Sequence, residues 1–344
     1  MRILPATFQL NSTLFTVALL FLAPLAGNGH AQFLDQSIDS KIPAKLDSAY
    51  LKGIRYLVNT QDEDGAWTSQ DSTYGGNPGV VGLTMMAILA HGDDPNSGPY
   101  AQTVQNSIKY IIDAQNEETG MIGDRMYDHG FATTALAEIY GMVDNDKIGP
   151  ALQKAVDLLV SSQAKNRRGG WRYDAGTTDS ADTSIVGCCL VALFAARNAG
   201  IEVPDESIEK GLSYLATVRT PEGGYGYTSA TSPNATRTAI GHLCFSLARD
   251  RDADGYNEGL EYLKKNLKFR DRNYAFYFEY YMSQALFHAD EKVWEEWNAA
   301  NISYLTTIQL ADGSWASDKG STFSTAGALL SLALNYRFLP IYER

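Results

Sequence analysis

The chain has 344 residues, of which 40 are acidic and 28 are basic, so its formal net charge at pH 7 is −12. An acidic surface repels nucleic acids and anionic membranes, which excludes proteins that bind either one through charge. The three cysteines, Cys188, Cys189 and Cys244, do not make a disulfide scaffold, and a chain of this length buries a core without one.

The first 31 residues have the pattern of a secretory signal peptide. Arg2 is the only Lys, Arg, Asp or Glu among them, and an apolar run extends from Leu14 to Leu25. We predict a cleaved signal peptide at 1–31, a linker at 32–42 and a secreted or periplasmic mature protein; the alternative is an uncleaved N-terminal anchor. No later apolar run is long enough to span a bilayer, so we expect no membrane span after cleavage.

One sequence unit then recurs along the chain. The segment "YLVNTQDEDGAW" at 56–67 has strong or partial copies that begin at 110, 158, 214, 262 and 304. The equivalents of Gln61 follow at intervals of 42 to 56 residues, a spacing typical of repeat architectures. These equivalent positions are Gln115, Gln163, Arg219, Leu267 and Gln309.

Each unit predicts a pair of helices. An amphipathic helix ends at a Gly-rich turn, and a second helix that is apolar nearly all round follows, as in "SIVGCCLVALFAA" at 184–196. A helix of the second kind must be buried, so six amphipathic helices should surround six buried ones. We therefore expect an all-α, six-hairpin α/α toroid over 43–344, with an open solenoid as the alternative. In the turns that contain them, the Gln and the Trp are expected to tie neighbouring helix pairs together.

These turns resemble the QW repeats of the squalene-hopene cyclase and protein prenyltransferase β-subunit superfamily. "QDEDGAW" at 61–67 and "QLADGSW" at 309–315 match that pattern closely. "MYDHGFATTALAEIYGM" and "GGWRYD" are similar to segments of secreted bacterial prenyltransferase and squalene oxidase repeat proteins. The resemblance covers most of the mature chain and implies a six-hairpin barrel whose central cavity holds an isoprenoid in the enzymes.

The resemblance does not extend to the acid of the cyclases, which donate a proton from the middle Asp of a DxDD-T motif. In "DSADT", Asp179 and Asp182 align with the outer Asp positions, and Ala181 stands where the acid should be. Asp182 also precedes a buried helix and suits its N-cap. Two interpretations of Asp182 stay open: a structural cap or ion pair, and a displaced acid.

The prenyltransferases also need zinc, held by Asp, Cys and His. None of the residues of this kind reproduces the family's spacing, so zinc is not expected. The residues considered are His129, Cys188, Cys189, His242 and Cys244.

Further polar and aromatic residues fall at the starts of the buried helices. Asp128 and His129 flank one start, and Glu138 lies inside the same helix, where it must be paired or neutral. With Arg237 and Glu279 they would form a polar ring at one mouth of the barrel. The candidate catalytic residues are therefore Asp179, Asp182, His129 and Glu138. Aromatic residues near Glu279 would either stabilise carbocations or simply pack; these are Tyr277, Phe278, Tyr280 and Tyr281.

The segment "DRDADGYNEGLE" at 250–261 matches the D-x-D-x-D-G-x5-E pattern of a calcium loop without a gap. It predicts a solitary structural Ca²⁺ site, whereas the alternative is an acidic turn with an incidental match. The expected ligands are the side chains of Asp250, Asp252, Asp254, Glu258 and Glu261 and the carbonyl of Tyr256.

The sequence leaves three classes of function open. The first is a ligand- or partner-binding module without the family's acid or zinc chemistry, which takes an isoprenoid, another hydrophobic ligand or a protein. The second is a terpene cyclase-like isomerase, or another enzyme of prenyl substrates, with a displaced acid. The third is a polysaccharide lyase or hydrolase, because α/α toroids also host carbohydrate chemistry.

Overall fold

The computed structural model describes residues 42–71 and 73–343. These residues belong to one compact unit, Ile42–Arg344, which is distinct from Met1–Lys41. The signal peptide expected at 1–31 and nearly all of the linker lie outside the described residues. Among the described residues, no helix combines the length and apolarity that a membrane crossing needs.

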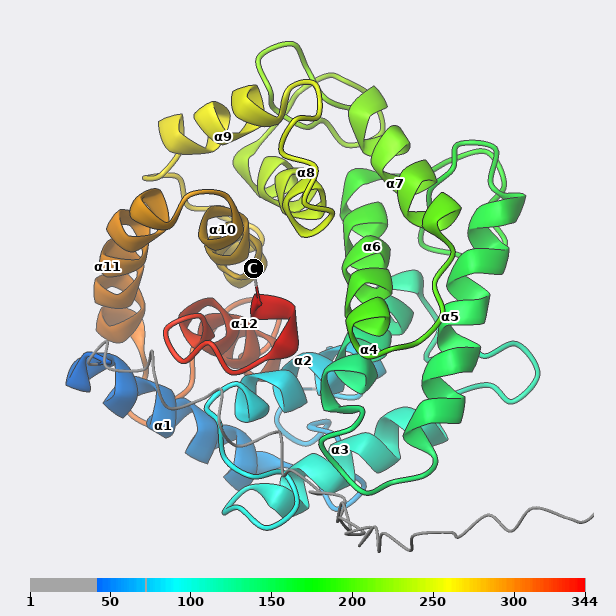
Figure 1. Cartoon of the computed structure of the whole chain (residues 1–344). Coiled ribbons are helices and arrows are strands. Elements are labelled where there is room, and N and C mark those ends of the chain that lie inside the picture. The colour runs from blue at the N-terminus through cyan, green and yellow to red at the C-terminus, as the bar shows by residue number, and fades with distance from the viewer. Residues whose placement is uncertain (1–41, 72, 344) are drawn as a thin grey trace, which may run out of the picture. The chain divides into compact units, whose positions relative to one another are not determined.

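Twelve α-helices alternate along the described chain between an outer and an inner ring (Figure 1). The outer helices are α1 (Ala44–Thr60), α3 (Ala101–Asp113), α5 (Ile148–Lys165), α7 (Asp205–Thr217), α9 (Tyr256–Lys265) and α11 (Glu291–Ile308). The inner helices are α2 (Pro78–Leu89), α4 (Met126–Ile139), α6 (Thr183–Asn198), α8 (Ala235–Leu247), α10 (Ala275–Ala289) and α12 (Ser321–Ala333).

Burial follows the sequence pattern of each helix. Every residue of α2 is buried, whereas α1 buries one face and exposes the other. Each inner helix packs against two inner neighbours, and α12 packs against α2, so the ring closes. The expected α/α toroid is therefore confirmed, and the open solenoid is wrong.

Glutamine amides connect the hairpins as the sequence indicates. Each of four glutamines donates from Nε2 to a carbonyl in its own turn and to a carbonyl of the next outer helix. The pairs that reach the next helix are Gln61–Thr103, Gln115–Ala151, Gln163–Ser207 and Gln309–Ala49. The last pair joins the sixth hairpin to the first and reinforces the closure of the ring.

The C-terminal segment fills one end of the barrel. Figure 1 shows the chain ending at the centre of the ring, and a short 3₁₀ helix, η1 (Pro340–Tyr342), packs against α6. Ile341 and Tyr342 are buried, and the N–H of Ile341 donates to Oε2 of Glu138 in the last turn of α4 at 3.1 Å. The barrel is thus plugged where the inner helices end, which leaves the opposite end for a site.

Candidate functional site: a cavity where the inner helices begin

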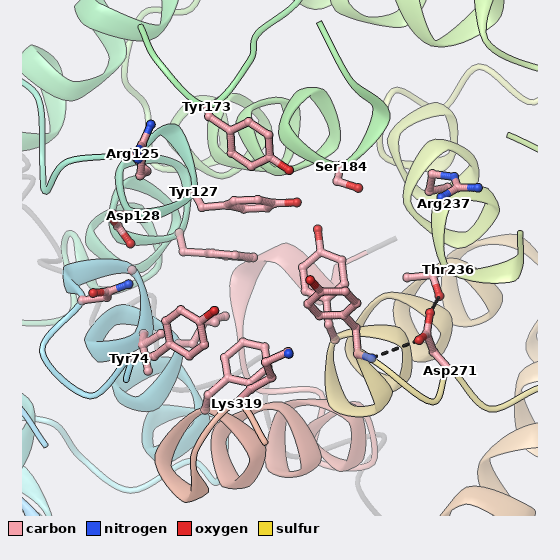
Figure 2. Close-up of a pocket in the computed structure, with 18 of the residues that line it drawn as sticks. Tyr74, Arg125, Tyr127, Asp128, Tyr173, Ser184, Thr236, Arg237, Asp271 and Lys319 are labelled. Carbon is pink, nitrogen blue, oxygen red and sulfur yellow. Dashed lines mark hydrogen bonds between the residues drawn. The ribbon is translucent and has the colours of Figure 1, made fainter. Parts of the chain in front are cut away.

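A cavity of about 620 Å³ lies at the end of the barrel where the inner helices begin (Figure 2). This volume is within the usual range for small-molecule sites. All six inner helices, or the loops that lead into them, contribute to its wall. The lining residues are Tyr74, Asn77, Gly79, Val80, Leu83, Arg125, Tyr127, Asp128, Phe131, Tyr173, Ser184, Tyr227, Asn234, Thr236, Arg237, Asp271, Tyr274, Tyr277, Lys319 and Phe323.

Aromatic rings make up much of the wall, and they hold one another in place. Tyr127 and Phe131, one turn apart on α4, are stacked at 6.2 Å with an interplanar angle of 11°. Tyr277 from α10 meets both rings edge-on. With Val80 and Leu83 of α2 and Phe323 of α12, Phe131 gives the cavity an apolar patch. A ligand therefore meets an apolar surface that is already in place.

Four hydroxyls form a polar strip in the same cavity, which we call the hydroxyl wall: Tyr127, Tyr173, Ser184 and Tyr227. The hydroxyls of Tyr173 and Tyr227 share a hydrogen bond of 2.7 Å. Burial raises the pKa of Tyr127, and the neighbouring hydroxyls of Tyr277 and Ser184 act against that rise. These groups are neutral at physiological pH, so the wall donates and accepts hydrogen bonds without carrying charge.

An arginine just outside the cavity fixes part of this wall. The Arg172 guanidinium lies 5.2 Å from the ring centre of Tyr173 and 5.0 Å from that of Tyr227. Its Nη1 is 3.1 Å from Oδ2 of Asp182, which is fully buried. Asp182 also caps α6, because its Oδ1 accepts from the N–H groups of Ser184 and Ile185. The structure thus supports the cap and ion-pair interpretation of Asp182.

Two carboxylates line the cavity, on opposite sides in Figure 2. Burial raises the pKa of Asp128, in the first turn of α4, to about 6. Asp271 is already engaged by the protein, because it accepts from the Thr236 hydroxyl of α8 and from the N–H groups of Asn273 and Tyr274 in its own loop. Asp128 is therefore the cavity carboxyl with a pKa suited to exchanging a proton near neutral pH.

None of the four catalytic candidates lines the cavity, and the structure does not bring them together. His129 is fully buried: its Nδ1 accepts from the N–H of Ile122, its Nε2 lies 3.0 Å from the Ala155 carbonyl, and burial lowers its pKa to about 4. Asp179 is exposed and 3.7 Å from the Arg167 guanidinium. Glu138 lies under the C-terminal segment, at the other end of the barrel.

The expected polar ring and aromatic surface are present only in part. Asp128, Arg237 and Tyr277 reach the cavity. Glu279 does not line the cavity: it is buried 3.2 Å from the Arg270 guanidinium, and burial raises its pKa to about 8 although Arg270 acts to lower it. Three of the predicted aromatic residues belong to the core and not to the cavity lining: Phe278, Tyr280 and Tyr281.

The cysteines and His242 are buried in the helix packing. Each of the three thiols is free, and Nε2 of His242 lies 3.2 Å from the Tyr256 carbonyl. Among the described residues, no group of three or more His, Cys, Asp or Glu side chains lies close enough together to hold a metal ion. The arrangement gives no support to a zinc site.

The segment at 250–261 forms a turn followed by a helix. Gly255 has a φ of +74°, as the loop pattern requires, and α9 begins at the next residue, Tyr256. The Tyr256 carbonyl already faces His242, and Glu261 pairs with Lys264 at 3.0 Å. Calcium would therefore have to displace these partners and draw together carboxylates that do not form a metal-binding group within the described residues; the Ca²⁺ site stays a prediction.

The calcium prediction has a direct measurement. If the loop binds Ca²⁺, millimolar calcium is expected to raise the melting temperature of the mature chain, because a ligand that binds only the folded state stabilises it. Asp250→Ala is expected to abolish that rise, whereas Asp144→Ala, which removes a carboxylate elsewhere, leaves it intact. An unchanged melting temperature at millimolar calcium favours the acidic turn.

Asp182 gives a second prediction, because its two roles can be separated. Asp182→Ala removes the cap and the partner of Arg172, and it is expected to lower the free energy of unfolding by about 1–2 kcal/mol or more. Asp182→Asn keeps an oxygen that accepts from Ser184 and Ile185, so we expect a smaller loss. Urea unfolding at pH 7 measures both. An equal loss in the two variants means that the ion pair, not the cap, carries the effect.

Comparisons with known proteins agree with the architecture. No protein-family model and no curated protein sequence matches the chain.

Solved structures share its fold. An inactive variant of the GH76A α-1,6-mannanase of Salegentibacter sp. HEL1_6, in complex with α-1,6-mannotriose, aligns with a TM-score of 0.65 and 10% identity over 85% of this chain and 99% of that one. A variant of the type II terpene cyclase MstE from Scytonema, in complex with merosterolic acid A, aligns with a TM-score of 0.58 and 16% identity over 84% and 96%. Identities this low establish the α/α toroid fold alone.

Sequence reasoning missed most of the lining residues. Tyr74 and Tyr173 lie in loops outside the recurring turns, and Lys319 lies in the loop before α12. A signal was available: all six inner helices run in the same direction, so the residues at their starts must meet at one end of the barrel. The sequence analysis used this signal for Asp128 and Arg237, and collecting all six starts would also have gathered Tyr127 and Ser184.

Proposed function

We propose that the mature chain is a ligand-binding module that holds a small molecule in the cavity where its inner helices begin. The observation that carries this proposal is the composition of the cavity, in which an apolar patch and a strip of neutral hydroxyls face the same space. Such a combination is typical of sites that bury a ligand and fix its orientation. The two neighbours cited above hold a mannotriose and a merosterolic acid, so the fold accommodates ligands of both kinds. Export through residues 1–31 would place this module outside the cytoplasm.

The positions and partners of the carboxylates favour ligand binding over the acid catalysis of a cyclase. Ala181 occupies the position of the cyclase acid, and Asp182 is held by a helix end and by Arg172. Hydrolysis of a glycosidic bond ordinarily uses two carboxyl groups that flank the bond. Of the two carboxylates that line this cavity, Asp271 already accepts three hydrogen bonds from the protein, which leaves only Asp128 for such a role.

An enzyme is the second candidate, and one observation favours it. Asp128 is nine-tenths buried, lines the cavity and has a pKa raised to about 6, which suits a general acid or base. A single acid of this kind supports isomerisation by proton transfer. Turnover of a ligand that is lost in Asp128→Asn, while the ligand still binds, would establish this function.

The proposal is tested by identifying what the cavity holds. The mature protein is purified from the secretory compartment of its own cells and analysed by native mass spectrometry, then again after denaturation. We expect a stoichiometric small molecule. A variant with a filled cavity, Val80→Trp, is expected to lose it, whereas Thr307→Trp on the exposed face of α11 is expected to keep it. An empty natural protein, or equal loss in both variants, overturns the proposal.

A further inference from the structure

We propose that the ligand of this cavity belongs to the neutral saccharides, bound with its hydroxyls along the hydroxyl wall and a ring face on the apolar patch. This inference rests on the proposed function, because it names the class of molecule that the cavity takes. It follows from three features of the site: the hydroxyls, the way they are held, and the pairing of the charged groups around them.

The hydroxyl wall suits a ligand that both donates and accepts hydrogen bonds. Figure 2 shows Tyr127, Tyr173 and Ser184 together on one side of the cavity. A tyrosine or serine hydroxyl has one donor and two acceptor positions, which are the same capacities as those of a sugar hydroxyl. A hydrocarbon chain on this side would leave these groups unpaired, and each unpaired group costs free energy.

The hydroxyls are also fixed before a ligand arrives. Arg172 lies between the rings of Tyr173 and Tyr227, and Asp182 holds Arg172 in turn. Tyr127 is fixed by its stack on Phe131. Side chains that are already ordered lose little entropy when a ligand binds. A neutral ligand gains no free energy from ion pairs, so this low cost favours its binding.

Of the five charged side chains that line the cavity, Arg237, Lys319 and Asp271 are engaged by the protein itself. The other two, Arg125 and Asp128, carry opposite charges, so the set favours a neutral ligand over an ionic one. The Arg237 guanidinium donates to the carbonyls of Tyr225 and Ser232. Lys319 pairs with Asp318 at 2.8 Å, and Asp271 accepts three hydrogen bonds. A saccharide ring has a polar edge and an apolar C–H face, so it matches a cavity with a hydroxyl wall and the apolar patch of Val80, Leu83, Phe131 and Phe323.

The test separates a saccharide from an isoprenoid with substitutions that remove only an oxygen. Calorimetric titrations are made with a panel of neutral hexose disaccharides and trisaccharides and, separately, with geranylgeraniol in detergent. Tyr173→Phe and Tyr227→Phe remove hydroxyls of the wall and keep both rings. The matched control is Tyr140→Phe, which removes a partly exposed hydroxyl at the other end of α4.

We expect at least one saccharide to bind, with a dissociation constant that rises roughly tenfold in Tyr173→Phe and in Tyr227→Phe and stays unchanged in Tyr140→Phe. Two results overturn the inference and leave the proposed function intact: geranylgeraniol binds while no saccharide does, or a saccharide binds equally well to all variants. No binding of any probe, together with no co-purified ligand, overturns both.

Discussion

Glu138→Gln is expected to make the chain more stable at pH 7 than the natural sequence, by about 2 kcal/mol. Glu138 is buried in α4, one of its oxygens has no hydrogen-bond partner within the described residues, and burial raises its pKa from 4.5 to about 8. Between these two pH values the folded chain must keep a proton that the unfolded chain releases. Gln carries no charge at any pH and still offers an oxygen to the N–H of Ile341.

The sign and size of the effect follow from linkage. A carboxyl group whose pKa is raised by folding destabilises the folded state as pH rises, from the unfolded pKa of about 4.5 up to the folded pKa of about 8. Each pKa unit corresponds to about 1.4 kcal/mol, so the cost reaches roughly 3 kcal/mol at pH 7. Replacing Glu138 by Gln removes this cost, but the amide adds buried N–H donors without partners, which costs about 1 kcal/mol. The net gain in stability is therefore about 2 kcal/mol.

The groups around Glu138 show which variant is a suitable control for Glu138→Gln. Burial is the main cause of the raised pKa; Glu343 adds repulsion, and the N–H of Ile341 acts against both. Tyr280 and Tyr342, also close to Glu138, keep their protons because their own pKa values are raised. Urea unfolding at pH 5, 7 and 8.5 should show a steep loss of stability in the natural chain, nearly the same loss in Glu343→Gln, and a flatter profile in Glu138→Gln. A Glu138→Gln profile as steep as the natural one would show that other groups cause the pH dependence.

The fold could be predicted because each helix encodes its own position. An inner helix such as α2 is apolar on every side, and an outer helix such as α1 has one polar face, so local sequence separates the two rings. The capping role of Asp182 could also be predicted, since an N-cap depends only on the next three residues. Local patterns therefore gave the architecture and one end of α6.

The roles of the candidate residues and the lining of the cavity could not be predicted in the same way, because the contacts that decide them depend on the tertiary structure. Glu138 depends on a C-terminal segment 203 residues away, and His129 on the N–H of Ile122 and the carbonyl of Ala155, which no side-chain pattern reveals. The hydroxyl pair of Tyr173 and Tyr227 joins loops 54 residues apart. Only the folded ring brings the two tyrosines together in one cavity.

Trp315→Ala is expected to cost about 3–5 kcal/mol, the usual range for removing a fully buried tryptophan. The indole N–H of Trp315 donates to the Leu305 carbonyl at 2.9 Å. Its ring lies against Gly53 of α1, where a Cβ atom would come within 3.0 Å of it. Trp315 therefore packs at the seam where the sixth hairpin meets the first, beside the Gln309–Ala49 hydrogen bond.

The equivalent residue in the third hairpin provides the matched control. Trp171 donates to the Leu159 carbonyl at the same distance but lies in the middle of the chain. Both Trp→Ala variants should lower the free energy of urea unfolding. Only Trp315→Ala should also speed amide hydrogen exchange in α1, because α1 is held to α12 and α11 across that seam and can detach without unfolding the rest. Trp315→Phe, which keeps a ring but removes one of the two hydrogen bonds that the Leu305 carbonyl accepts, should cost about 1 kcal/mol. Unchanged exchange in α1 would mean that the Trp315 ring does not hold α1 at the seam, which leaves the Gln309–Ala49 hydrogen bond and the packing of α12 on α2 to close the ring.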